Sequence, residues 1–194
     1  VIGAHHDHLG LNSLTGEIYH GANDNASGVA MLLELASQLA TAHTKLNIVF
    51  VAFGGEEKGL LGSRYFTEHS PVPLNKIRLM INLDIIGNMT ADTLCYYKSN
   101  VDLPLPGING SGLNLKREDA GISDHISFMM AKIPTVFFHT GYDAERIHTP
   151  HDREQNINYD GMVKTLYFLK DLILAIDDGM KDTTRPAVKV SGKP

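Results

Sequence analysis

The chain has only one cysteine, no tryptophan and no long apolar run among its 194 residues. Because Cys95 is alone, an intrachain disulfide is excluded and a thiolate zinc site is not expected. Cys95 lies in the apolar stretch TLCYY, which is typical of a core residue. No apolar run approaches the ~18 residues that a membrane span needs, so none is predicted.

Runs of like charge are also absent. The net charge of -5, from 17 basic and 22 acidic side chains, argues against a nucleic-acid partner. With 43% hydrophobic and 20% charged residues, the composition is that of one globular domain, which we place at residues 1–178, followed by a polar tail at 179–194. The first residues, VIGA, read as part of a strand without a start signal, so we expect the sequence to be part of a longer chain.

Strand and helix patterns alternate along the chain. Continuous apolar runs rich in Val, Ile and Phe predict buried strands at residues 1–4, 46–53, 77–86 and 135–139. Helical spacing of apolar residues predicts helices near residues 27–42, 59–69, 123–133 and 159–177. This alternation favours an α/β fold with a sheet that is at least partly parallel, and ligands bind such sheets beyond the carboxyl ends of the strands.

Histidines or carboxylates lie at the end of each predicted strand. HHDHLG, GGEEKG and TGYDAERIHTPHD follow three of the strands, Asp84 falls near the end of the fourth, and a further acidic residue, Asp24, precedes the first helix. Taken singly, Asp24 is well explained as a helix cap and His5 as a core histidine. Asp84 is harder to explain in this way, because a carboxylate within MINLDII should be paired or bound to metal. The convergence of such residues at strand ends favours a metal site.

Six motifs in order then resemble one family. They are GAHHDHLG, GANDNASGVA, GGEEKGLLGS, NLDIIGN, SDHISF and HTPHD, and together they resemble the co-catalytic dizinc aminopeptidases, a group related to carboxypeptidases and glutaminyl cyclases. The resemblance implies a three-layer α/β/α fold with a mixed, mostly parallel sheet, here lacking the family's N-terminal helix and hairpin. It also implies a secreted or periplasmic protein, and we keep a second copy of the chain as a candidate partner.

The resemblance implies a role for each matching residue. Glu56 would be the general base, and Asp7 would orient a histidine ligand. Two zinc ions, or other divalent ions, would be held with Asp24 as the shared ligand. The full ligand set implied is His5, Asp24, Glu57, Asp84 and His148. The substrate implied is a peptide with a free N-terminus, whose bond is cleaved by a metal-activated water.

Two substrate contacts are less well defined by the motifs. Asp124 in SDHISF is a candidate for the substrate amine and equally a helix cap. Many members of the family carry tyrosine directly before the last histidine ligand, where it can stabilise the oxyanion. Here that position is Ile147, and Tyr142 is the candidate substitute. His8 and His20 are expected to be surface residues.

Three rival functions remain open. A carboxypeptidase or dipeptidase of the same family would keep the same ligands. A glutaminyl cyclase is disfavoured, because its members carry pocket tryptophans and this chain has none. A non-catalytic interaction domain is also disfavoured, because such relatives tend to lose ligands and every ligand position is filled here.

Overall fold

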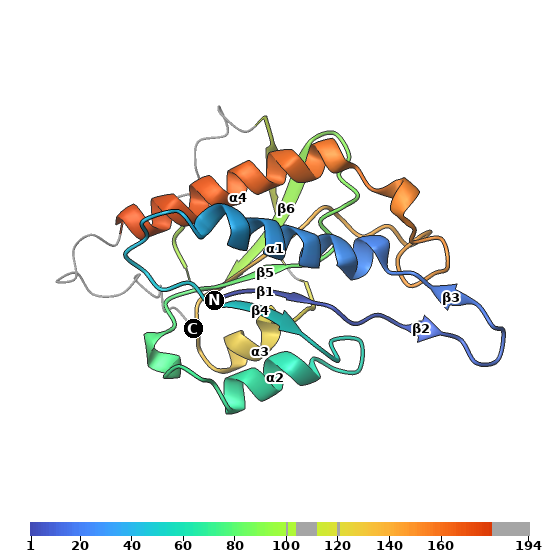
Figure 1. Cartoon of the computed structure of the whole chain (residues 1–194), viewed down its shortest axis with the longest axis horizontal. Coiled ribbons are helices and arrows are strands. Elements are labelled where there is room, and N and C mark those ends of the chain that lie inside the picture. The colour runs from blue at the N-terminus through green and yellow to red at the C-terminus, as the bar shows by residue number, and fades with distance from the viewer. Residues whose placement is uncertain (100, 104–111, 120, 180–194) are drawn as a thin grey trace.

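The computed structural model describes residues 1–99, 101–103, 112–119 and 121–179. Within these residues, six strands form one sheet in the order β4-β1-β5-β8-β6-β7, and helices cover both of its faces (Figure 1). Most neighbouring strands are parallel, and only the β6–β8 pair is antiparallel. The predicted three-layer class with a mixed, mostly parallel sheet is therefore confirmed.

Four parallel strands build the part of the sheet that carries the site. They are β1 (Ile2–His5), β4 (Phe50–Phe53), β5 (Met80–Leu83) and β8 (Thr135–His139). All residues of β1, β5 and β8 are buried, as their continuous apolar runs predict. Because the strands are parallel, the residues that follow each of them reach the same edge of the sheet.

Two further strands and one hairpin were not predicted. β6 (Thr93–Ser99) pairs with β8, and β7 (Asn114–Arg117) pairs with β6 at the edge. β2 (Gly10–Leu11) and β3 (Ile18–Tyr19) form a separate hairpin that projects from the carboxyl side of β1 (Figure 1). Cys95 in β6 is 4% exposed, which confirms it as a core residue.

The four predicted helices are present, with shorter bounds for three of them. Helices α1 (Gly28–Leu39) and α4 (Tyr159–Gly179) lie together on one face, and α2 (Leu61–Glu68) and α3 (His125–Met130) lie on the other (Figure 1). Short turns η1 (Ala22–Ser27), η2 (Leu74–Lys76) and η3 (Glu154–Asn156) complete the elements. Gly179 ends α4, and the rest of the predicted tail lies outside the described residues.

Hydrophobic side chains fill both helix–sheet interfaces. The larger core lies between the sheet and the α1/α4 layer, and a smaller one joins Phe53 and Met80 to Phe128 of α3. Each such side chain contributes roughly 1.5–3 kcal/mol by leaving water. No helix within the described residues is both long and apolar enough to cross a membrane. The two cores hold the strand ends, and the residues on them, in place.

Candidate metal centre

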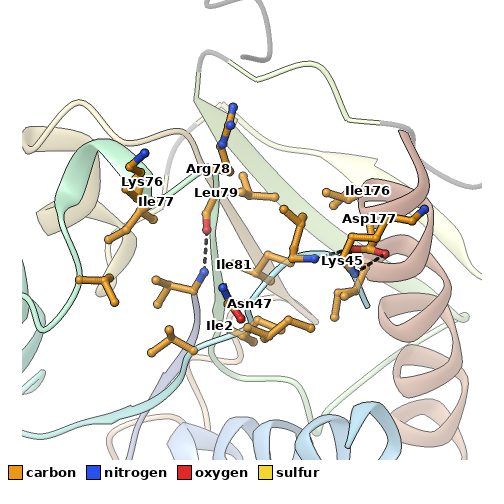
Figure 2. Close-up of a pocket in the computed structure, with 16 residues that line it drawn as sticks. Ile2, Lys45, Asn47, Lys76, Ile77, Arg78, Leu79, Ile81, Ile176 and Asp177 are labelled. Atoms are coloured by element: carbon orange, nitrogen blue, oxygen red, sulfur yellow. Dashed lines mark hydrogen bonds between the residues drawn. The ribbon is translucent and has the colours of Figure 1, made fainter. Parts of the chain in front are cut away.

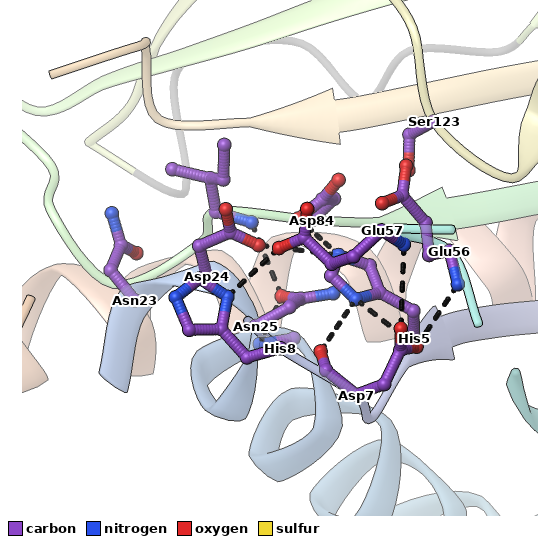
Figure 3. A network of polar contacts seen from close by, with 12 residues as sticks. His5, Asp7, His8, Asn23, Asp24, Asn25, Glu56, Glu57, Asp84 and Ser123 are labelled. Atoms are coloured by element: carbon purple, nitrogen blue, oxygen red, sulfur yellow. Dashed lines mark hydrogen bonds and ion pairs between the residues drawn. The ribbon is translucent and has the colours of Figure 1, made fainter. Parts of the chain in front are cut away.

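The strand ends deliver the predicted residues to one place. His5 is the last residue of β1, Glu57 follows β4, and Asp84 comes directly after β5. Asp24 lies in η1, before α1, and His148 lies in the loop after β8. Figure 3 shows His5, Asp24, Glu57 and Asp84 converging at the carboxyl edge of the sheet. The predicted ligand set is therefore brought together in space.

The first group of converging atoms centres on the His5 ring. Nε2 of His5 lies 3.2 Å from Oδ1 of Asp84 and 3.3 Å from Oδ1 of Asp24. All three side chains are buried. One imidazole nitrogen and two carboxylate oxygens within this distance of one another can bind one divalent ion.

The second group uses the other oxygen of Asp24. Oδ2 of Asp24 lies 3.0 Å from Nε2 of His148, and that nitrogen lies 3.2 Å from Oε2 of Glu57. Asp24 thus faces one group with each of its oxygens, as a bridging carboxylate must. The geometry offers two adjoining groups of ligand-type atoms that share Asp24.

Asp7 makes a contact that its predicted role did not include. The Nδ1 atom of His5 lies 3.1 Å from the backbone oxygen of Asp7, nearer than the Asp7 carboxylate at 3.8 Å. That carboxylate instead accepts the backbone N–H groups of Glu56 at 3.1 Å and Glu57 at 3.3 Å. Asp7 therefore orients His5 through its carbonyl group and anchors the turn after β4 through its side chain.

That turn also depends on a glycine. Gly55 has a φ of 74°, a conformation that glycine adopts without the steric penalty of a Cβ atom. The turn it makes directs Glu56 and Glu57 away from the strand. The two carboxylates then leave the backbone in different directions, as Figure 3 shows.

Asp152 is a supporting residue that the sequence analysis missed. It is 1% exposed, and its two carboxylate oxygens accept the N–H groups of Asn23 at 2.8 Å and Asp24 at 2.9 Å. Asp152 thus ties the loop of His148 to the segment of Asp24. The only sequence signal was its place at the end of the HTPHD motif, which begins with the candidate ligand His148.

Backbone strain accompanies the site. Ile85, next to Asp84, has a φ of 56°, and His148 has a φ of 58°. Such positions are rare for residues other than glycine, and each costs roughly 1–3 kcal/mol. Hydrogen bonds hold Ile85 in place, since its N–H donates to Asn25 at 3.2 Å and its carbonyl accepts the Thr140 N–H at 2.9 Å.

The charges of the cluster fit a bound cation. Burial acts to lower the pKa of His5, but hydrogen bonds to Asp24 and Asp84 outweigh it and raise that pKa to about 12. Within the described residues, the ion-pair partners of Asp24, Glu57 and Asp84 are histidine rings. Buried carboxylates that hold a proton on a histidine so strongly suit a hard or borderline divalent metal, which would neutralise them.

Glu56 has a different environment from its neighbour. Burial raises the pKa of its carboxyl group to about 8, with the charges of Asp84, Asp124 and Glu57 acting in the same direction and that of His5 against them. A carboxyl group held near neutral pH can both take and return a proton. Bound cations would lower this pKa from its metal-free value.

The two predicted substrate contacts lie in contrasting places. Asp124 is fully buried, burial raises the pKa of its carboxyl group to about 6, and neither of its carboxylate oxygens has a hydrogen-bond partner within the described residues. Tyr142 is 67% exposed in the loop that leads to His148. Ile147, at the position of the family tyrosine, is 2% exposed and packs inward. Asp124 directly precedes α3, but its carboxylate makes no capping hydrogen bond to that helix, so the capping alternative is wrong. The substrate roles of Asp124 and Tyr142 stay predictions.

His8 also lies in the cluster, although a surface position was expected. Its side chain is 9% exposed, and its Nδ1 atom lies 2.9 Å from Oε1 of Glu57. The expectation was wrong because the His8 side chain points into the cluster, where Figure 3 shows it next to Asp24. The spacing of HHDH gave no sign of this contact.

A second group of three ligand-type residues is less suited to bind a metal than the residues around Asp24. Cys95, Glu118 and His139 lie close together. The Gly141 N–H donates to Nδ1 of His139 at 3.1 Å, so the neutral ring carries its proton on Nε2. Nε2 lies 3.2 Å from the Glu118 carboxylate and, because it carries the proton, has no lone pair to offer a metal ion.

An apolar pocket lies elsewhere on the molecule. It lies at the amino ends of the strands and is lined by Ile2 of β1, Leu79 just before β5, Ile81 in β5 and Ile176 of α4 (Figure 2). The Val1 amine donates to the Leu79 carbonyl beside it at 2.8 Å. The pocket contains none of the predicted site residues, so it is separate from the metal centre.

Several known proteins are similar to this chain in sequence and in fold. Aminopeptidase YwaD of Bacillus subtilis is 32% identical over 155 residues, which cover 71% of this chain and 34% of that protein. The structure of BSAP, a zinc aminopeptidase from Bacillus subtilis, matches with a TM-score of 0.73 and 25% identity, over 97% of this chain and 48% of that one. An aminopeptidase from Aneurinibacillus sp. strain AM-1 matches with a TM-score of 0.73 and 27% identity, over 100% of this chain and 45% of that one.

The chain spans half or less of the length of these relatives. The family match nevertheless covers almost all of the described domain, because the model of peptidase family M28 matches residues 1–172. Together with the relatives named as aminopeptidases, this match shows that the chain belongs to peptidase family M28.

Proposed function

We propose that this chain is the catalytic domain of a zinc-dependent aminopeptidase. The observation that carries the proposal is the sharing of Asp24, whose two oxygens lie 3.3 Å from His5 and 3.0 Å from His148. Relatives named as zinc aminopeptidases support zinc as the metal. We infer two ions, one held by His5, Asp24 and Asp84 and the other by Asp24, Glu57 and His148.

The residues of the chain would divide the work of peptide hydrolysis. Two bound divalent ions supply a polarised substrate carbonyl and a more acidic water. Glu56 would accept a proton from the attacking water and later donate it to the leaving amine. The cluster is open on one side, since the His148 side chain is 46% exposed, and a substrate can approach there.

The test compares free and blocked substrates. The purified 194-residue chain, loaded with zinc, is assayed on a panel of aminoacyl 4-nitroanilides and on their N-acetylated counterparts. We expect hydrolysis of the free amines alone. Equal hydrolysis of the acetylated compounds, or none of either by protein with bound zinc, would overturn the aminopeptidase assignment. A dipeptide with a free carboxyl terminus and an acetylated amine tests the carboxypeptidase alternative.

Replacing each glutamate with glutamine separates their roles. We expect Glu56→Gln to keep both metals and lose about 10²–10⁴-fold in kcat, the usual contribution of a general base. Glu57→Gln should instead lower the metal content, measured by elemental analysis after dialysis. Glu68→Gln, at an exposed position in α2, is the matched control. Normal turnover by metal-loaded Glu56→Gln would contradict the assignment of the base.

A further inference from the structure

We propose that His8 is a positioning residue that aims the Glu57 carboxylate at the second metal position, an inference that rests on the proposed function. The two oxygens of Glu57 have different neighbours. Oε2 lies 3.2 Å from Nε2 of His148, on the metal side, whereas Oε1 lies 2.9 Å from Nδ1 of His8. The hydrogen bond from His8 therefore leaves only Oε2 directed at the metal.

Glu57 needs such a partner because the backbone alone does not fix its carboxylate. Asp7 holds the Glu57 N–H group at 3.3 Å, which sets the position of the main chain. Three side-chain torsions still separate the backbone from the oxygens, and the last of them has no sharp minimum. A hydrogen bond at one oxygen fixes that torsion and so determines which lone pair meets the ion.

The His8 ring packs in a confined space beside Gly21. Its side chain is 9% exposed, and its ring lies 5.8 Å from that of His148. A Cβ atom on Gly21 would come within 2.7 Å of His8 Cγ, so the ring occupies space that only glycine leaves free. Since an ionised carboxylate only accepts hydrogen bonds, the proton of this contact lies on Nδ1 of His8.

A direct ligand role for His8 is the alternative. His8, Asp24 and Glu57 do lie within ligand distance of one another. However, His148 already faces both Asp24 and Glu57, while His8 faces the Glu57 oxygen that points away from His148. This division of the two oxygens favours support of a ligand over direct binding.

Two variants distinguish the roles. His8→Phe keeps a ring in this space but removes the Nδ1 donor, whereas His8→Asn can place an amide N–H near the position of Nδ1. His20→Phe, at an exposed histidine after β3, is the control, and His8→Leu replaces His8→Phe if the latter does not fold. Zinc affinities of both sites are measured by competition with a chromogenic chelator, with metal content by elemental analysis.

The expected result is selective. His8→Phe should weaken one of two zinc sites by about 10–100-fold, the usual effect of losing a residue that supports a ligand. The other site should be unchanged, and His8→Asn and His20→Phe should both bind like the parent. Metal-free His8→Phe should unfold at a lower urea concentration than the parent, because its Glu57 carboxylate loses a hydrogen bond, whereas metal-free His20→Phe should match the parent.

Other outcomes overturn the inference in distinguishable ways. If His8→Phe binds both ions as tightly as the parent, His8 does not position Glu57. If His8→Asn loses as much affinity as His8→Phe, the ring nitrogen itself is required and His8 is a ligand. A parent chain that binds fewer than two ions overturns the proposed function, and this inference with it.

Discussion

Glu56 and Glu57 are adjacent in the chain but have different surroundings. Histidine rings engage both carboxylate oxygens of Glu57 at 2.9 and 3.2 Å. The carboxyl group of Glu56 has a raised pKa of about 8 because burial disfavours its charged form. The same residue type is therefore suited to hold a cation at one position and to exchange a proton at the next.

The raised pKa of Glu56 predicts a pH dependence for the metal-free protein. Between about 4.5 and about 8, the unfolded chain releases this proton and the folded chain keeps it. The native state then binds more protons, so the free energy of unfolding falls as pH rises through this range. Outside the range, Glu56 adds no further slope.

Urea unfolding of chelator-treated protein across this pH range measures the effect. We expect the free energy of unfolding of Glu56→Gln to fall less steeply with pH than that of the parent, because the glutamine side chain cannot ionise. Glu68→Gln, which lies on the exposed side of α2, should follow the parent. Identical slopes for Glu56→Gln and the parent would contradict the raised pKa.

At the scale of elements, η1 depends on the loop that follows β8. Asp152 satisfies the N–H groups of Asn23 and Asp24, both of which are buried. Asp152→Ala would leave two buried donors without partners, at about 1–3 kcal/mol each. We expect lower stability in urea and a loss of metal, since Asp24 would no longer be held. Asp160→Ala, at an exposed position in α4, should change neither.

β6 carries the single cysteine into the core. Burial raises the pKa of the Cys95 thiol to about 11, with Glu118 acting in the same direction. The thiolate is the reactive form, so we expect negligible reaction with a thiol reagent such as dithionitrobenzoate in the native protein at pH 8. Denaturant should expose one reactive thiol per chain. Rapid labelling of the folded protein would contradict the burial of β6.

The elements were predictable where one signal dominated. Continuous apolar runs identified β1, β5 and β8, because strands covered on both faces are apolar throughout. The same pattern identified β4, but this strand lies at the edge of the sheet and its Ala52 is exposed, so its predicted burial is wrong. β6 and β7 carry polar residues near the edge of the sheet, and β2 and β3 are too short to leave a pattern. In α1, Leu33 is 66% exposed although it is apolar, because the buried stripe of this helix runs through Met31 and Leu35.

The site was predictable in its ligands and less so in its supports. Ligands must be histidine or carboxylate, so their type and their place after strands identified them. Asp152 and His8 act through contacts with residues 128 and 49 positions away. Such pairings depend on the path of loops, which local spacing does not encode. Asp7 was predicted as a support, but its hold on the turn after β4 required the structure.

At the scale of the whole molecule, the site gathers five segments. Without metal, its carboxylates pair with histidines in the part of the chain that the structure describes, and Asp24 and Asp84 repel one another across His5. An ion that binds only the folded chain stabilises it, by about 2.7 kcal/mol at a hundredfold excess over Kd. We therefore expect chelation to lower the Tm measured by calorimetry and added zinc to restore it. A Tm that is indifferent to zinc would contradict a metal centre.

β1 is the first strand in sequence, yet it lies inside the sheet between β4 and β5. Ile2 pairs with Phe50 on one side and Ile81 on the other, so neither neighbour has been synthesised when β1 emerges. Pairings of such long sequence separation form late in folding. The last ligand, His148, comes from still further along the chain. A growing chain therefore cannot complete the proposed metal centre until every strand of the sheet has been made.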